Sequence, residues 1–483
     1  MSGHKLKCGL EVHAQLLTKQ KLFSSTSTSF HAPPNTRVSY YDAALPGTQP
    51  RFNYDCLRLA LTAAAALNCD VKRSFSFDRK HYMYPDQPAG YQITQHFEPF
   101  AMGGFLDVMA RDYSKPRGHP TTRVNIKQIQ IEQDTAKTIY VDNVSQVDLN
   151  RTNTGLIELV TEPDLPTAES AGVFVKKLQT LLRHLGVCNG EMETGAMRVD
   201  VNVSVDDGER CEIKNLFSTS AVVAAIKAEF NRQIRDIESG KVISSETRGW
   251  DGKETWKLRG KEGSIDYRYM PDPELPVVRL PDSIVEKIRR SMPALPDQVL
   301  DELVAAPYNV PLVDAKTLMD HGMRYVNFYR DSHALFTKSG GKKTSIVSNW
   351  LVHRWLGQTE TQVFPSVQVF TDLLIAMDKG EITSTSAKLI LKHLVGLAES
   401  NELTPDVTIK SIIDEFDLGT AEADDQLDAV CAGVIEENPD AANRYRSGKR
   451  NAVSFLLGAT MKATQGTYSP AQVKSALERL LKN

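Results

Sequence analysis

A carboxylate and an imidazole stand two residues apart near the start of the chain. In residues 9–16, GLEVHAQL, apolar side chains alternate with Glu11, His13 and Gln15. This period of two is typical of a β-strand with one apolar face. On such a strand Glu11 and His13 lie about 7 Å apart and point the same way. The pair is therefore either part of a solvated face or half of a metal site.

Two later stretches place carboxylates where a buried strand is expected. In residues 127–137, KQIQIEQDTAK, the alternation puts Gln128, Gln130 and Glu132 on one face. In the segment GLIELVTEP, Glu158 interrupts an otherwise apolar run. A lone buried carboxylate costs several kcal/mol (about 3–5 when a partner is lost) unless it is paired or bound to a cation. Both carboxylates are therefore candidates for a cation site.

Three carboxylates and one imidazole make a hard, mostly oxygen ligand set. Such a set suits Mg²⁺ or Mn²⁺ better than a structural zinc ion, which favours thiolates and more imidazoles. Taken singly, each residue is explained at least as well by a structural role. A common site is the hypothesis that needs all of Glu11, His13, Glu132 and Glu158 to converge.

The clearest strand of the sequence is residues 197–205, MRVDVNVSV, which alternates apolar and polar side chains. An Asp-Asp-Gly turn and a second alternating segment, 210–216 (RCEIKNL), predict a β-hairpin. One face of this hairpin carries Asp200, Asn202 and Lys214, which are groups that bind cations and anions.

The segment 77–95, FDRKHYMYPDQPAGYQITQ, sets Arg79 and Lys80 in an aromatic loop. A cation pair of this kind suits contact with phosphate or a nucleotide, and a turn with surface cations is the equally good structural explanation. The sequence has no GxxxxGK[ST], GxGxxG or GxSxG motif. A P-loop, a Rossmann site and a serine hydrolase are therefore unsupported.

The length of the chain and its proline-rich stretches predict several domains. At 483 residues it exceeds one ordinary core. Strands dominate the first part, with helices expected at 166–186 and 220–240, and prolines become frequent over 271–296. Beyond that point the pattern is helical, with a break near 400–407. We expect three domains: 1–290, 291–405 and 406–483.

Net charge, cysteine spacing and the lack of long apolar runs limit the classes of protein to which the chain can belong. Net charge is −3, and the six cysteines are scattered without a CxxC pair, which favours a reducing compartment and no disulfide framework. No apolar run approaches the length of a membrane helix, so no membrane insertion is expected. Residues 411–440 carry ten acids and no Lys or Arg, whereas 441–483 carry eight Lys or Arg and one acid. The basic end is a nucleic-acid contact or a solvated helix face.

Long motifs together resemble the B subunit of the glutamyl-tRNA(Gln) amidotransferases, over essentially the whole chain. The resemblance implies an α+β fold: a cradle-shaped mixed α/β catalytic domain, an all-helical domain, and a small helical tail that contacts tRNA. The motifs that carry it are GLEVHAQL (9–16), LPGTQPRFN (45–53), FDRKHYMYPDQPAGYQITQ (77–95), DLNRTNTGLIELVTEPD (148–164), METGAMRVDVNVSV (192–205), EIKNLFS (212–218), KEGSIDYRYMPDPELP (261–276) and SGKRNAVSFLLGATMKATQG (447–466).

The resemblance also implies a chemistry. ATP phosphorylates the γ-carboxylate of glutamate on misacylated Glu-tRNA(Gln), and ammonia from a partner amidase (the A subunit, a glutaminase) then displaces phosphate. A small third subunit completes a heterotrimer. Carried over by motif, the Mg²⁺ ligands are Glu11, His13, Glu132 and Glu158, which also form the catalytic set. The nucleotide-binding set is Arg79, Lys80, Asp200, Asn202 and Lys214.

Departures from the bacterial pattern point to a branch of the family. Many bacterial members read His-Met-Glu-Glu-Asp-Ala-Gly-Lys where this chain has QIEQDTAK, so Gln133 and Ala136 replace a Glu and a Gly. This pattern resembles the mitochondrial branch and implies the matrix, although the first residues show no clear presequence. The zinc-binding cysteines of some bacterial members correspond to Ser24, Thr26, Ser39 and Asp42, so that zinc is expected to be absent.

Two other functions remain open on the sequence. The chain could be a non-catalytic subunit that binds tRNA through its basic tail, with the cradle as scaffold. It could also be a stand-alone ATP-dependent carboxylate ligase for a small molecule. Retention of all four candidate ligands argues against the scaffold, and the basic tail argues against the small-molecule ligase.

Overall fold

The computed structural model divides the chain into two compact units, Met1–Pro296 and Asp297–Asn483. The structure describes these residues: 3–29, 31–116, 118–260, 266–357, 364–400, 402, 404, 407–416, 418–419, 425–447, 450–464 and 468–482.

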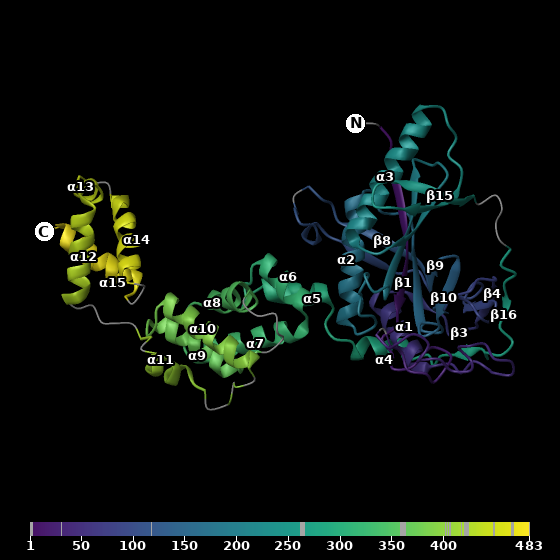
Figure 1. The fold of residues 1–483 in the computed structure, drawn as a ribbon, viewed down its shortest axis with the longest axis horizontal. Helices are drawn as coiled ribbons and strands as arrows, with labels where there is room; N and C mark the ends of the chain where they lie inside the picture. The colour runs from purple at the N-terminus through teal and green to yellow at the C-terminus, as the bar shows by residue number, and fades with distance from the viewer. Residues whose placement is uncertain are drawn as a thin grey trace. The chain divides into compact units, whose positions relative to one another are not determined.

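A ten-stranded sheet organises the first unit (Figure 1). Its order is β15-β14-β13-β12-β1-β11-β8-β6-β2, and β7 also pairs with β8. The bounds are β1 Leu6–Gln15, β2 Asp70–Val71, β6 Ala101–Met102, β7 Phe105–Val108, β8 Thr122–Gln133, β11 Gly155–Thr161, β12 Met197–Val205, β13 Cys211–Leu216, β14 Glu246–Trp250 and β15 Thr255–Gly260.

The central strands alternate as their sequences predict. Leu10, Val12 and Ala14 of β1 are at most 2% exposed and face the core. The intervening residues of β1 face the opposite side, and the same alternation holds in β11 and β12. Because these strands pair antiparallel in register, their polar residues gather on one face of the sheet.

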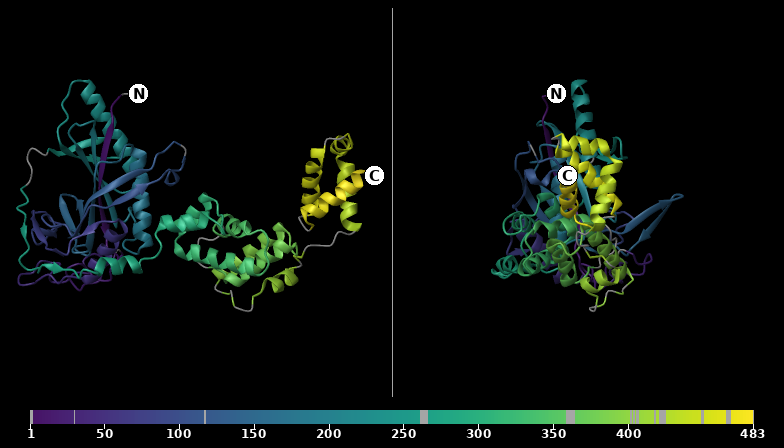
Figure 2. Two further views of the ribbon diagram at one scale, coloured as in Figure 1. Left: turned by 180° about the vertical axis from the view of Figure 1, so that it is seen from behind. Right: turned by 90° about the vertical axis from the view of Figure 1, so that its left-hand side faces the viewer.

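Two helices cover the core face of the sheet. α2 (Ala168–His184) and α3 (Thr219–Glu238) pack against each other on that side (Figures 1 and 2). Thr167 caps α2 and Ser218 caps α3, each accepting a hydrogen bond from a first-turn backbone amide. Both helices were expected from the sequence, and they begin and end within two residues of the expected ranges. The opposite face of the sheet is left to the polar residues.

Smaller elements complete the first unit. α1 (Tyr54–Ala66) contributes a run of buried alanines and leucines to the same core. Three short strands form a separate sheet in the order β16-β4-β5. The remaining bounds are β3 Ser74–Phe75, β4 Asp78–His81, β5 Tyr91–Thr94, β9 Lys137–Val141, β10 Val144–Asp148, β16 Met270–Pro271, β17 Val278–Arg279 and α4 Ile284–Ser291.

The second unit is helical where it is described. Its buried apolar residues form two clusters, one over Val299–Ile412 and one over Leu427–Leu481. The bounds are α5 Pro296–Val304, α6 Leu312–His321, α7 Met323–Lys338, α8 Ser345–Trp350, α9 Val367–Lys379, α10 Ser384–Glu399, α11 Ile409–Phe416, α12 Asp425–Glu437, α13 Pro439–Arg446, α14 Val453–Ala463 and α15 Pro470–Lys482.

The α+β fold class expected from the sequence is confirmed, with a sheet-rich unit followed by a helical one. All six cysteines are buried free thiols. No helix in the described part of the chain combines the length and apolar character needed to cross a bilayer.

Candidate active site

Four neighbouring strands bring the sequence-predicted side chains together on the open face of the sheet. His13 of β1 lies opposite Glu158 of β11, and Glu11 lies opposite Asp200 of β12. Glu132 lies at the end of β8, which pairs with β11 on its far side. Strand pairing therefore gathers residues that are up to 204 positions apart in sequence, Glu11 and Asn215, into one cavity of about 180 Å³.

An imidazole and two carboxylates form the centre of this cavity. His13 Nε2 lies 3.5 Å from Glu132 Oε1 and 3.9 Å from Glu158 Oε2. One ligand atom from each residue lies within 4.8 Å of the others. Thr94 Oγ1 donates a hydrogen bond of 3.3 Å to Glu132, and Gln130 Nε2 donates one to Glu158. The three side chains are thus held with their polar atoms converging.

The electrostatics of these carboxylates favour a bound cation. Burial raises the pKa of Glu158 to about 7, and the neighbouring Glu132 adds to the rise. Burial likewise raises the pKa of Glu132, although Lys80 opposes the shift. A buried and a half-buried carboxylate beside one imidazole are a donor set that Mg²⁺ or Mn²⁺ accepts. The residues present therefore fit the metal that the resemblance implies.

Glu11 belongs to a second cluster beside the first. Its carboxylate groups with those of Asp200 and Glu212, again with ligand atoms within 4.8 Å. Lys214 Nζ lies 3.1 Å from Asp200 Oδ2 and 2.7 Å from Glu212 Oε1. Asn202 Nδ2 donates a 3.1 Å hydrogen bond to Glu11 Oε1. Glu11 lines the same cavity as His13, and a spacing of two residues along the strand puts the two side chains about 7 Å apart on one face.

A bulge in β13 turns Lys214 toward this second cluster. The pairing with β12 slips between Val199 and Val201, so two residues of β13 oppose Asp200. Asn215 takes a left-handed conformation with φ of 61° at that point, and its backbone amide donates a 2.8 Å hydrogen bond to Asp200 Oδ1. The bulge therefore places Lys214 and Asn215 together at the cavity wall.

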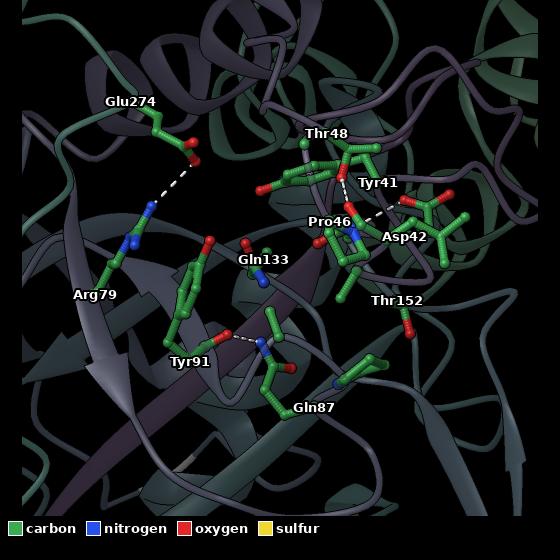
Figure 3. Close-up of a pocket in the computed structure, with 16 residues that line it drawn as sticks. Tyr41, Asp42, Pro46, Thr48, Arg79, Gln87, Tyr91, Gln133, Thr152 and Glu274 are labelled. Atoms are coloured by element: carbon green, nitrogen blue, oxygen red, sulfur yellow. Dashed lines mark hydrogen bonds and ion pairs between the residues drawn. The ribbon is translucent and has the colours of Figure 1, made fainter.

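Arg79 and Lys80 line different cavities. Lys80 lines the cavity of His13, with Nζ 4.8 Å from the centre of the Tyr267 ring. Arg79 instead lines a neighbouring cavity of about 240 Å³, where it pairs with Glu274 at 3.0 Å (Figure 3). Arg79 Nε also pairs with Asp272 Oδ2, at 2.7 Å. Successive residues of a strand point to opposite faces, so β4 cannot present both cations to one site.

Two residues that the sequence did not single out also line the cavity. Arg198 lies opposite His13 on β12, and its Nη2 donates a 2.9 Å hydrogen bond to Asp134 Oδ1. Burial alone would raise the pKa of Asp134, but Arg198 and Arg151 outweigh it and lower that pKa. The alternation in 197–205 already placed Arg198 on the polar face, so this signal could have found it. Only the tertiary pairing identifies Asp134.

Comparison with known proteins gives the chain a family. Residues 6–286 match the GatB/GatE catalytic domain, and residues 335–481 match the GatB domain. The mitochondrial glutamyl-tRNA(Gln) amidotransferase B subunit of Yarrowia lipolytica is 45% identical, over 98% of this chain and 94% of that protein. The same subunit of Scheffersomyces stipitis is 42% identical, over 99% of this chain and 96% of that protein. The chain belongs to this B-subunit family.

A third relative, from Debaryomyces hansenii, is 41% identical over 99% of this chain and 95% of that protein. All three proteins are named as mitochondrial. The mitochondrial branch expected from the sequence is therefore confirmed, and the chain is a mitochondrial member of the family.

The branch-specific Gln133 stands outside the metal-ligand candidates. It is 3% exposed and lines the cavity of Arg79, where it is labelled in Figure 3. Glu132, the preceding residue, faces His13 on the other side of the strand. A family member can therefore carry an amide at position 133 without changing the donor set around His13.

A buried ion pair stands among the positions of the bacterial zinc cysteines. Lys21 Nζ lies 3.1 Å from Asp42 Oδ2, and neither side chain is exposed. The ammonium also donates to the carbonyl oxygens of Arg37, at 2.8 Å, and Leu149, at 3.2 Å. Ser24 Oγ donates to the other oxygen of Asp42 at 3.0 Å. An internal cation thus joins three separate loops here.

Proposed function

We propose that the chain catalyses ATP-dependent conversion of misacylated Glu-tRNA(Gln) to Gln-tRNA(Gln) as the ligase component of a carbon–nitrogen ligase complex. The observation that carries this proposal is the convergence of His13, Glu132 and Glu158 in a cavity whose lining also includes Lys80, Arg198 and Lys214. The names of the relatives supply the substrate, since they are glutamyl-tRNA(Gln) amidotransferase subunits.

The reaction needs two transfers. A carboxylate is a poor electrophile, so the γ-carboxylate oxygen of the tRNA-bound glutamate first takes the γ-phosphoryl group of ATP and releases ADP. Ammonia then attacks the carbonyl carbon of the γ-carboxyl group, phosphate leaves with the C–O bonding pair, and a proton is lost to give the amide. Mg²⁺, when bound by His13, Glu132 and Glu158, supplies neutralisation of charge on phosphoryl oxygens.

The residues around the cavity have separable roles in this proposal. Lys80, Lys214 and Arg198 place three cations on its wall, where they contact phosphoryl oxygens. Asp200 and Glu212 hold the Lys214 ammonium in position. Asn202 orients Glu11 through its hydrogen bond. Arg79 is assigned to the wall of the neighbouring cavity and not to the phosphoryl groups.

The proposal also assigns the partner subunits and the subcellular compartment. Ammonia comes from a separate amidase (glutaminase), the A subunit, because this chain shows no Ser/Lys amidase or GxSxG signature. A small third subunit completes a heterotrimer. We assign the complex to the mitochondrial matrix, where ATP and tRNA are both present.

A single-turnover assay tests the proposal directly. The chain is assembled with its amidase partner and given Glu-tRNA(Gln), ammonium, ATP and Mg²⁺. We expect Gln-tRNA formation that requires ATP in the wild type and is lost in Glu11→Gln, because Glu11 lines the same cavity as the His13 cluster. Activity that survives in Glu11→Gln would keep the enzyme and remove Glu11 from its centre. An assembled wild-type complex without activity would favour a scaffold role in which the chain only binds tRNA.

Mg²⁺ binding is expected to depend on pH through Glu158. Because the pKa of Glu158 is raised to about 7, a proton competes with the metal below that pH. Apparent Mg²⁺ affinity should therefore be about tenfold weaker at pH 6 than at pH 8, with proton release on binding. Isothermal titration at several pH values measures both.

The matched control for this pH dependence is Glu162→Gln, which makes the same change at an exposed residue just after β11. It should keep the full dependence, whereas Glu158→Gln should bind Mg²⁺ more weakly and lose most of the slope. An affinity that is constant from pH 6 to 8 in the wild type would contradict the assignment of Glu158 as a ligand.

We also propose that the basic end of the chain contacts tRNA. Arg444 of α13 and Lys462 of α14 are exposed, and a contact with nucleic-acid phosphates neutralises such cations. The double variant Arg444→Gln/Lys462→Gln should bind tRNA more weakly, with a salt slope smaller by about 1–2. Filter binding over a series of salt concentrations checks this, and an unchanged slope would remove the tail from the contact.

Deleting residues 441–483, by contrast, is a poor test. The apolar cluster over Leu427–Leu481 spans that cut, so truncation would expose the partners of the removed helices. Charge substitution leaves the cluster intact.

A further inference from the structure

A cavity of about 390 Å³ lies in the helical unit, where the proposed amidation has no step. Its volume falls in the range of small-molecule sites, about 300–1,000 Å³, and exceeds that of the His13 cavity. Residues of α6, of α8 and of the loop before α8 line it. We call it the Asp314 cavity after the buried carboxylate on its wall.

The carboxylate of Asp314 is only partly satisfied by its neighbours. Asp314 lies in the first turn of α6, where a negative charge is favourable, and it is 7% exposed. His353 Nε2 lies 3.0 Å from its Oδ1. In the part of the chain that the structure describes, no group donates a hydrogen bond to Oδ2. This oxygen is therefore free to accept hydrogen bonds from a molecule in the cavity.

α8 adds an unpartnered amide and apolar surface to the same cavity. Ser345 and Asn349 lie one turn apart on α8, and both line the cavity together with Ile346 and Trp350. Asn349 is exposed, and its side-chain amide has no hydrogen-bond partner among the residues described. The next turn, Leu351–Trp355, is π-helical, a rare geometry that is frequent at functional sites.

Two lysines stand on the loop before α8. A Cβ at Gly341 would lie 2.3 Å from the Phe336 ring, so glycine lets this loop follow α7 closely. The backbone amide of Lys342 donates a 2.7 Å hydrogen bond to Asp378 Oδ2, which fixes the loop to α9. Lys342 and Lys343 are exposed, and neither ammonium has an acidic partner within the described ranges. Because Lys343 also lines the cavity, the loop holds unpaired cations beside it.

These groups match the parts of a guanosine phosphate. The Watson–Crick edge of guanine carries two adjacent donors, N1–H and N2–H, which a carboxylate such as Asp314 accepts together. The Asn349 amide can donate to O6 or N7, the acceptors of the same base. Unpaired lysines bind phosphate through charge-assisted hydrogen bonds. Adenine fits less well, because its N1 is an acceptor and would face the carboxylate.

We propose that the Asp314 cavity binds a guanosine phosphate, with its base at Asp314 and Asn349 and its phosphate at Lys342 and Lys343. Two sources present these groups: a free guanine nucleotide and an unpaired guanosine within an RNA chain. The cavity belongs to the second compact unit and the His13 cluster to the first, so the site does not depend on the proposed amidation.

Equilibrium binding to the assembled complex tests the contacts with the base. GMP, IMP and AMP are titrated by isothermal calorimetry. IMP lacks only the N2 amino group, so it should bind about tenfold more weakly than GMP. Asp314→Asn should remove this preference, whereas Asp331→Asn, at an exposed acid of α7 outside the cavity, should keep it. Asn349→Ala should weaken GMP binding by about tenfold, and it removes no hydrogen bond of the described fold.

A second pair of ligands separates the two sources of guanosine. A short single-stranded RNA with one guanosine is compared with the same RNA carrying inosine at that position. Tighter binding of GMP than of IMP assigns the cavity to a free nucleotide, and a preference seen only in the RNA pair assigns it to RNA. In the double variant Lys342→Gln/Lys343→Gln, GMP should bind no more tightly than guanosine, which lacks the phosphate.

Two results would overturn the proposal. The first is the absence of a guanine preference in both pairs of ligands. The second is a preference that both Asp314→Asn and Asn349→Ala leave at its wild-type size. Because no readout requires amidation, a complex that fails the single-turnover assay would refute the proposed function separately.

Discussion

Replacing Glu132 with Gln is expected to reduce amidation by about a thousandfold while tRNA affinity stays within about twofold of wild type. The substitution keeps the size of the side chain and its contact with Thr94. It removes the negative charge that faces His13 at 3.5 Å, and with it one of the two carboxylates of the His13 cluster. Charge neutralisation at the phosphoryl group is therefore lost, whereas tRNA affinity comes from backbone phosphates elsewhere.

The measurement pairs two assays on one preparation of the assembled complex. Single-turnover formation of Gln-tRNA reports chemistry, and filter binding reports tRNA affinity. Glu162→Gln serves as the control, because it removes a carboxylate from an exposed position of the same region. Equal losses of amidation and tRNA binding in Glu132→Gln would contradict the metal assignment.

Replacing Lys21 with Met is expected to destabilise the first unit by about 3–5 kcal/mol, because it strands the Asp42 carboxylate in the interior. Burial lowers the pKa of Lys21, whereas the Asp42 charge raises it. The charge on Asp42 therefore favours the protonated form of Lys21, and the Lys21 ammonium in turn compensates the buried carboxylate. For a unit of this size the loss corresponds to a fall in Tm of about 10 °C.

Thermal unfolding followed by circular dichroism in the isolated chain detects this shift. Lys19→Met, at an exposed site two residues away, should leave the Tm within about 1 °C. Adding Asp42→Asn to Lys21→Met should recover part of the loss, since the uncompensated charge is removed. A Lys21→Met protein with wild-type Tm would show that Asp42 finds another partner.

The strands that build the site were predictable from sequence because one face of each strand is apolar and the other is polar. Alternation alone located β1, β11 and β12 and identified Glu11, His13, Glu158 and Asp200 as polar residues on them. What alternation cannot supply is register between strands. His13 therefore meets Glu158, while Glu11 joins Asp200 and Glu212 in a separate cluster.

Other parts of the site depend on contacts that leave no local pattern. Lys80 and Arg79 were expected to act together, but consecutive strand residues face opposite ways. Asp134 is fixed by Arg198, which is 64 residues away in sequence. Lys21 reads as an ordinary surface lysine in the segment LTKQKLF, and only the folded loops reveal that it is buried.

Because all six thiols are buried, the chemical modification of each cysteine reports local unfolding around it. Burial raises the pKa of Cys8, Cys69 and Cys211 to about 12 and that of Cys56 and Cys188 to about 11. At pH 8 a thiol of pKa 11 is ionised in about one molecule per thousand, so peroxide and alkylating reagents find almost no thiolate while the fold is closed. Each cysteine becomes reactive only when its surroundings separate. Because Cys431 alone lies in the second unit, the order in which the six sulfurs are modified tells which unit opens first.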